Sequence, residues 1–303
     1  MMIEDWKRHI DQVVADVGEW IGLADANGVP LCDLPPAESV SAPETRLAVD
    51  NREVVIPARG RIAPTNSAVE ALVAKHLGQF DETGALAPAT DGDYMVIVAR
   101  PGLRLAFNVV FARAEGPSDA PNKLTIGGVS LDDLLEAHPA PSVPLAWHTS
   151  KLEKWTEDAG GKYAKPRQLG AVEMATKADG YTLTGPAVEV IRELCQDSFD
   201  AVNAMYGFKD PHLVVDYGTP TAKGERITIQ VQDDALWPTM LAAAESAGVN
   251  VHVELWWPGD AAFPVRGQRI PNTDLNQDEK FGPPVLKSFT HPIGRVVVEE
   301  VGK

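Results

Sequence analysis

The sequence VNVHVELWWPGD, residues 249–260, is the stretch that decides how this chain folds. It alternates apolar and polar residues, which is the period of a β-strand, and it then turns at Pro258-Gly259. Because side chains in a strand point alternately to opposite faces, Trp257 shares a face with aliphatic residues, whereas Trp256 shares a face with polar ones. We therefore predict that Trp257 belongs to the core.

The sequence does not determine what covers Trp256. An indole on a polar face is covered by its own chain, buried in a protein interface or stacked on a ligand such as a sugar, because it is amphipathic. We keep all three alternatives and treat Trp256 as an interface candidate.

Two helices are expected upstream of this strand. Pro186 suits the first turn of a helix, and apolar residues recur at helical spacing through Ile191 up to a stop near Gly207. A second helix is expected over residues 235–247, where it holds Trp237 and ends before a glycine. We predict that Ile191 and Trp237 lie in the core of this half.

The N-terminal half opens with a helical pattern and continues as strands. Trp6 and Ile10 belong to an apolar stripe at helical spacing, and this stripe must be covered either by this chain or by another. Trp6 and Ile10 are therefore interface candidates as well. Two strong strands over residues 94–115 meet at a Pro-Gly turn, and KLTIGGV at 123–129 reads as a third.

A cluster of prolines separates the two halves. Prolines at 139, 141 and 144 break regular structure, so we place a domain boundary near Pro139. This gives an N-terminal β-rich domain at 1–139, with a leading amphipathic helix, and a C-terminal α+β domain at 140–303. Both halves combine strands with inserted helices, without the strict alternation of a doubly wound parallel sheet. The predicted class is α+β, with antiparallel or barrel-like sheets.

Charge and cysteine content exclude several classes of protein. The chain has 43 acidic and 27 basic residues, and its net charge of -16 disfavours binding to nucleic acid or anionic lipid. Cys32 and Cys195 are too few and too far apart for a disulfide framework or a zinc site. No run of 18 apolar residues occurs, and the N-terminus is too charged for a signal peptide, so we expect no membrane insertion.

The sequence also lacks the usual catalytic motifs. It has no phosphate-binding loop, nucleophile elbow or HExxH pair, and none of its seven histidines lies three or four residues from another. His138 and His148, with Glu136 and Glu157 not far away, form one candidate group of metal ligands, which we weigh against a polar loop. We predict that the protein is not an enzyme and needs no cofactor or metal ion.

Four motifs follow one another in the C-terminal half. They are a helix after Gly185-Pro186, a D-x-L-W helix start at 234–237, an AGV turn at 247–249 and the ending L-W-x-P-G-D at 255–260. This order resembles the minor tail proteins of siphophages that infect actinobacteria, the baseplate or tail-tip hub family. The likeness covers roughly residues 140–260.

The resemblance implies a structural virion protein. Its expected form is a homotrimeric ring around the DNA channel of the tail tip, with two domains similar to the tail-tube β-barrel in each chain. The implied partners are further copies, the distal tail protein, the tape measure protein and other minor tail proteins. Genomic DNA would only pass through the lumen, which an acidic wall suits because like charges repel. The protein would be made in the host cytoplasm, and no catalytic residues come with this role.

Two other hypotheses stay open. The first is a carbohydrate-binding module for cell-wall glycans, with Trp256 and Trp155 as stacking platforms. An aromatic content of 7% makes rows of such platforms unexpected. The second is a hydrolase with a metal ion near His138 and His148.

Overall fold

The computed structural model describes residues 2–60, 65–80, 82–88, 90–117, 120–142, 144, 153–169, 181–218, 224–270 and 280–301. The chain divides into two compact units. Unit 1 contains Met1–Asp133 and two later segments, Val253–Asp260 and Ser288–Gly294. Unit 2 contains Leu134–His252, Ala261–Lys287 and Arg295–Lys303.

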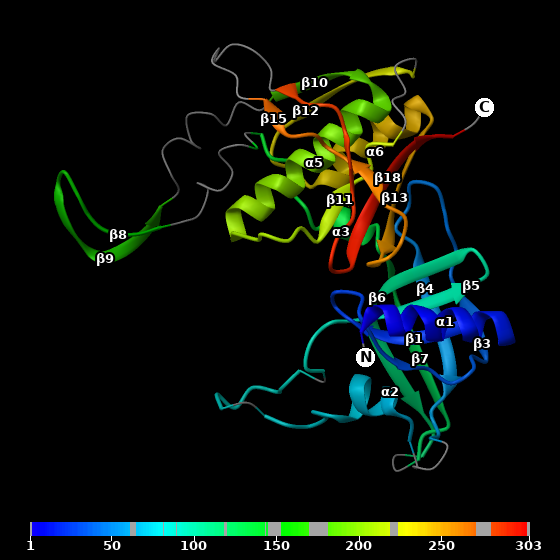
Figure 1. The fold of residues 1–303 in the computed structure, drawn as a ribbon. Coiled ribbons are helices and arrows are strands. Elements are labelled where there is room, and N and C mark those ends of the chain that lie inside the picture. The colour runs from blue at the N-terminus through cyan, green and yellow to red at the C-terminus, as the bar shows by residue number, and fades with distance from the viewer. Residues whose placement is uncertain are drawn as a thin grey trace. The chain divides into compact units, whose positions relative to one another are not determined.

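Unit 1 is built on one antiparallel sheet of seven strands, in the order β2-β1-β5-β6-β7-β4-β3 (Figure 1). In chain order the strands are β1 Trp20–Asp25, β2 Pro30–Asp33, β3 Ser39–Ser41, β4 Asn51–Pro57, β5 Tyr94–Arg100, β6 Leu103–Glu115 and β7 Lys123–Ser130. The β1–β2 hairpin turns through Gly28, whose φ of 79° favours glycine. The dipeptide Asn27-Gly28, a sequence typical of tight hairpin turns, lies in this first turn.

One face of this sheet carries a continuous apolar core. Alternate residues of the strands, such as Val96 and Val98 in β5, point to this face. The short helix α2 (Ser67–Val69) and the π-helix η1 (Glu70–Ala74) cover it with Ala68, Val69 and Leu72. The side chains of this core are Ile21, Leu23, Leu34, Val54, Ile56, Ala58, Ala68, Val69, Leu72, Val96, Val98, Phe107, Leu124 and Ile126.

The opposite face of the sheet is covered at β1 and β5 by helix α1, Ile3–Val17. Its buried residues are Trp6 and Ile10, and the Trp6 ring lies 6.3 Å from that of Trp20 at the start of β1. Met2, just before the helix, and Val17, its last residue, are exposed. Helix α1 therefore uses its middle turns to cover the sheet.

Unit 2 surrounds two longer helices, α5 Ala187–Tyr206 and α6 Leu236–Ala247. Ile191 in α5 and Trp237 in α6 are both buried. Strands β10 (Tyr181–Pro186) and β12 (Arg226–Val231) pair antiparallel, and a three-stranded sheet has the order β11-β18-β13. The remaining elements are α3 Asp133–Glu136, β11 Leu213–Val215, β13 Val249–Trp256, β18 Ile293–Glu300, and the pairs β8 Glu153–Asp158 with β9 Gly161–Leu169, β14 Phe263–Val265 with β17 Val285–Lys287, and β15 Arg269–Ile270 with β16 Lys280–Phe281.

The chain is thus mixed α+β and rich in strands, but the expected barrels are not confirmed. Within the described residues no sheet closes into a barrel, because β2 and β3 remain the two edges of the seven-stranded sheet. Both edge strands nevertheless pack against one core, β2 through Cys32 and the residue after it, Leu34, and β3 through Val40. The edge strands have four and three residues, which is short enough to limit further pairing.

The division into units differs from the boundary expected at Pro139. Residues around Pro139 are tied to unit 2, since Pro139 bridges to Ala235 and Ala140 exchanges backbone hydrogen bonds with Asp233 and Asp234. The segment Val253–Asp260 belongs instead to unit 1. The stretch WWPGD therefore belongs to the same unit as the N-terminal sheet, although it follows the last strand of that sheet by more than 100 residues.

Candidate functional site

The site begins with the tight turn that ends β13. The Asp260 amide donates to the Trp257 carbonyl at 2.9 Å, and Gly259 has φ 83°. Proline at the second position and a glycine with positive φ at the third are the residues that a type II turn requires. The Asp260 carboxylate also accepts the Trp257 amide at 2.8 Å, which fixes the side chain inside its own turn.

Two cations from distant parts of unit 1 converge on this carboxylate. Lys7 of α1 places its Nζ 2.6 Å from Asp260 Oδ1, and the Arg104 guanidinium of β6 donates to Oδ2. Arg104 also donates through Nη2 to the Leu255 carbonyl at 2.7 Å. We call Lys7, Arg104 and Asp260 the Asp260 clamp. It joins a helix, a strand and the later segment in one cluster of charge-assisted hydrogen bonds.

The clamp sets the charge state of Asp260. Partial burial acts to raise the pKa of its carboxyl group, but the hydrogen bonds from Arg104 and Lys7 outweigh that effect. The pKa of Asp260 therefore lies below its usual value. The carboxylate is the charged partner of both cations at neutral pH.

Trp257 is held next to the clamp and fully enclosed. Its indole Nε1 donates to the Gly28 carbonyl at 2.9 Å, and the Arg104 guanidinium carbon lies 4.3 Å from the ring centroid, a cation–π distance. Leu255 lies over the hairpin turn, where a Cβ on Gly28 would come within 2.6 Å of Leu255 Cδ1. Only 1% of Trp257 is exposed, so this residue supports the site and has no free face for a ligand.

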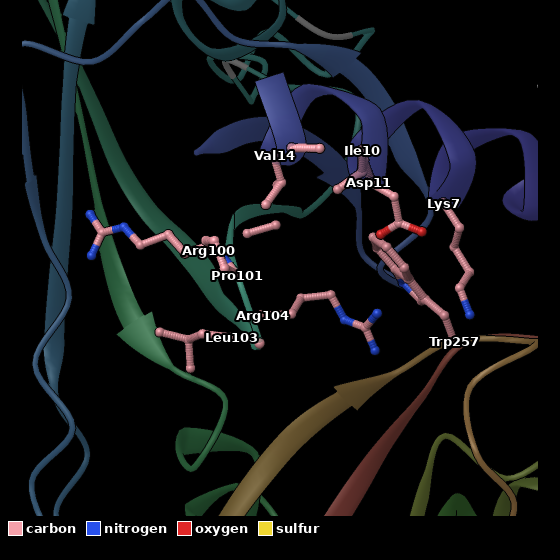
Figure 2. Close-up of a pocket in the computed structure, with 12 residues that line it drawn as sticks. Lys7, Ile10, Asp11, Val14, Arg100, Pro101, Leu103, Arg104 and Trp257 are labelled. Atoms are coloured by element: carbon pink, nitrogen blue, oxygen red, sulfur yellow. The ribbon is translucent and has the colours of Figure 1, made fainter. Parts of the chain in front are cut away.

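A pocket of about 620 Å³ opens beside this cluster, between α1 and the turn that joins β5 to β6 (Figure 2). Its helical wall carries apolar Ile10 and Val14, and Pro101 and Leu103 face them from the turn. The pocket is lined by Lys7, Ile10, Asp11, Val14, Ala15, Ala99, Arg100, Pro101, Gly102, Leu103, Arg104 and Trp257, and we call it the Trp257 pocket. The lining therefore combines apolar walls with three cations and one carboxylate.

The cations of the Trp257 pocket are positioned by neighbours rather than by the cavity alone. Arg100 donates through Nε to Glu19 at 2.6 Å, just beyond the end of α1. Lys7 and Arg104 hold Asp260. These pairs fix the cations at the rim of the pocket, and the apolar residues between them line its walls.

The interface candidates from the sequence lie inside the chain. Trp256 is 3% exposed and meets the Phe289 ring edge-on at 5.8 Å, so its own chain covers it. Trp6 and Ile10 are 8% and 4% exposed. These three residues offer little apolar surface to a neighbour, because a sheet and a later segment of unit 1 already cover them. A stacking role for Trp256 on a glycan is wrong for the same reason.

The metal hypothesis receives no support from the geometry of His138. Its Nδ1 donates to the Leu134 carbonyl at 2.7 Å, its ring packs edge-on against Phe199, and burial lowers its pKa. His148 lies outside the described residues. In the part of the chain that the structure describes, no three His, Cys, Asp or Glu side chains gather as a metal-binding group.

Sequence reasoning missed Lys7, Arg100, Arg104 and Asp260 as members of one site. The one available signal was the aspartate after Pro-Gly, which reads equally well as an ordinary turn residue. No protein-family model matches the chain, and no curated protein matches it either. Among the described helices, none has both the length and the apolar character needed to cross a membrane.

Proposed function

We propose that this chain is a structural protein of a siphophage tail tip, a baseplate hub subunit that forms a ring around the DNA channel. The observation that carries the proposal is the L-W-x-P-G-D ending of β13, which resembles an ending in that family. In this structure its aspartate, Asp260, pairs with Lys7 of α1 and Arg104 of β6, and Trp257, at the variable position of the motif, donates to the Gly28 carbonyl. A motif with this structural task suits a scaffold protein whose role needs no catalytic centre.

The charge of the chain supports the same proposal. With a net charge of -16, a ring of such subunits would present a repulsive wall to phosphate groups, so DNA would pass without binding. Copies would contact the distal tail protein, the tape measure protein and other minor tail proteins. A homotrimer is the assembly that we propose.

The decisive experiment locates the protein in particles. Antibodies raised against the chain are applied to purified virions of the phage that encodes it, and bound gold label is imaged by electron microscopy. Label confined to the tail tip is expected. Particles that contain no copy of the chain by mass spectrometry, or label along the whole tail or on the head, would overturn the proposal.

A second candidate function is glycan binding, and one observation favours it. Tyr206 and Phe208, at the end of α5, are 62% and 48% exposed and stack at 5.6 Å with an interplanar angle of 20°. Exposed aromatic faces are the usual platforms for sugar rings. Binding to cell-wall glycans that is lost in Tyr206→Ala would support this function, and a glycan array without signal would exclude it.

A further inference from the structure

Strands β8 and β9 of unit 2 form a two-stranded ribbon of their own (Figure 1). All residues from 154 to 168 are exposed except Tyr163, which is half-buried, so both faces of the ribbon are open to solvent. An isolated two-stranded ribbon is only marginally stable in water, and it gains stability from packing against a partner. The lysines and Pro166 on β9 disfavour the addition of a third strand, so a partner would contact the ribbon through its side chains.

Strand β9 carries positive charge that the described part of the chain does not pair. It contains Lys162, Lys165 and Arg167 and no acidic residue. Lys162 lies opposite Glu157 in the register, but no described carboxylate forms an ion pair with any of the three cations. The Arg167 guanidinium carbon lies 4.6 Å from the centroid of the Tyr163 ring, a cation–π contact that positions the side chain without neutralising its charge. These cations are therefore available to a carboxylate of another molecule.

The charge of the whole chain indicates which molecule that is. The net charge is -16, so a second copy presents a mostly acidic surface to β9. The same acidic surface repels a phosphate polymer that approaches the ribbon. A second copy of this chain is therefore the partner that the distribution of charge favours.

The exposed side of α1 offers three carboxylates without a cation partner. Glu4, Asp11 and Asp16 are exposed, and in the part of the chain that the structure describes none of them forms an ion pair. The basic side chains of the helix, Lys7 and Arg8, already pair with other aspartates. The three carboxylates extend over about 18 Å of helix axis, and the three cations of β9 extend over about 17 Å of strand. The two sets of charges thus match in number, sign and length.

Apolar side chains accompany both sets of charges. Trp155 lies opposite Arg167 in the register of β8 and β9, so both point to the same face of the ribbon, and the indole is 39% exposed. Met2 and Val17, just before and at the end of α1, are 69% and 76% exposed. Contact between such groups excludes water around neighbouring charge pairs, which strengthens the pairs.

We propose that strand β9 of one copy lies along the exposed side of α1 of a second copy, where its three cations pair with the three carboxylates. Within one chain no ion pair joins the described residues of β9 and α1, which leaves both surfaces for other copies. The contact uses two different surfaces, so it is heterologous and closes into a ring when the rotation between copies allows. The inference rests on the proposed function and deepens it, because it names the surfaces through which the subunits of the ring meet.

Charge reversal on each surface is the first test, with self-association measured by light scattering over a range of concentrations. Lys165→Glu with Arg167→Glu on β9, or Asp11→Lys with Asp16→Lys on α1, should weaken self-association by about 10-fold or more, because each replaces attraction by repulsion. A chain that carries all four reversals should regain the assembly. Arg113→Glu is the matched control, because Arg113 is exposed on β6 outside both surfaces.

The outcomes of charge reversal are distinct. Circular dichroism checks that each variant is folded. A monomer at all concentrations overturns the inference, and so does an oligomer whose mass the reversals do not change or a chain with four reversals that does not regain the assembly. Raising the salt concentration from about 0.05 M to about 0.5 M should weaken the assembly of the unaltered protein, because the charge pairs are near the surface. Assembly that is insensitive to salt contradicts the proposed contact.

The second test uses the unaltered protein. Unlabelled and isotope-labelled chains are mixed and treated with a carbodiimide, which joins lysine amines to neighbouring carboxylates. Crosslinks between β9 and α1 that combine one labelled and one unlabelled peptide are expected. Crosslinks between β9 and α1 of the same chain only would overturn the inference. Single-stranded DNA that binds the unaltered protein and not the β9 reversal would assign the ribbon to nucleic acid and overturn it as well. Gold labelling of virions decides the proposed function independently of these outcomes.

Discussion

Replacing Asp260 by alanine tests whether the clamp holds unit 1 together. The change removes one carboxylate that accepts three donors, namely Lys7, Arg104 and the Trp257 amide. The side chains of Lys7, Arg104 and Asp260 are 22%, 24% and 20% exposed, so the pairs lie between fully exposed and fully buried ones. Exposed ion pairs contribute about 0.2–1 kcal/mol, and removing one partner of a buried pair costs about 3–5 kcal/mol. We expect Asp260→Ala to lower the free energy of unfolding by about 2 kcal/mol.

Asparagine at the same position separates charge from hydrogen bonding. Asp260→Asn keeps an oxygen that can accept the Trp257 amide, so it should cost roughly half as much as Asp260→Ala. The assay is urea unfolding followed by tryptophan fluorescence, because Trp257 lies beside the clamp. Glu115→Ala is the control, since Glu115 pairs with Arg113 on the surface and its loss should stay within about 0.5 kcal/mol.

The clamp also predicts a dependence on pH with a definite sign. The pKa of Asp260 is lower in the folded protein than in the unfolded chain, so folding favours the ionised form. The stability from this shift is fully present above the unfolded carboxyl pKa of about 3.9 and is lost as the pH falls through the folded pKa. The stability difference between the protein and Asp260→Asn should therefore be constant near pH 7 and shrink below about pH 4. A cost for Asp260→Ala under 0.5 kcal/mol, or a difference that does not change with pH, would refute the clamp.

Three further predictions concern packing and reactivity. Trp257→Ala and Trp256→Ala should each cost about 3–5 kcal/mol in urea unfolding, because both indoles are buried; a loss confined to Trp257→Ala would contradict the covered position of Trp256. Gly28→Ala should lower the free energy of unfolding by about 1–2 kcal/mol, because φ is 79° there and the new Cβ would clash with Leu255. Unchanged stability in the same assay would contradict this clash. Cys195 should resist alkylation at pH 8 until urea unfolds unit 2, because burial raises the pKa of its thiol to about 12; labelling in the folded protein, measured by mass spectrometry, would be inconsistent with this burial.

Periodicity in the sequence predicts the local elements of this chain well, because the physical causes are local. Helix α5 follows Pro186 and stops at Gly207, whose φ of 71° ends the helix in the left-handed region. The alternation in β13 places Trp257 away from solvent, and that residue is buried. The class α+β follows from such elements alone.

The sequence pattern does not show which distant residues bury or pair with a given side chain. The alternation assigns Trp256 to the polar face of β13, but it carries no information about Phe289, which covers that indole from a segment more than 30 residues later. The Asp260 clamp is hidden in the same way, since Lys7 and Asp260 are 253 residues apart. Charge pairs at this separation leave no periodic pattern, so only the folded chain can reveal them.

The same principle gives a physical meaning to the acidic composition. Several basic side chains of this chain pair with its own carboxylates: Lys7 and Arg104 with Asp260, Arg100 with Glu19, Arg266 with Asp197 and Asp200, and Arg295 with Asp216. A phosphate group that approached one of these cations would have to displace a carboxylate already in contact with it. In the folded chain these cations therefore form intramolecular ion pairs. The excess of acidic residues makes the electrostatic potential around the protein negative. A subunit with this distribution of charge can line a channel for DNA without holding the DNA, which is what the proposed hub requires.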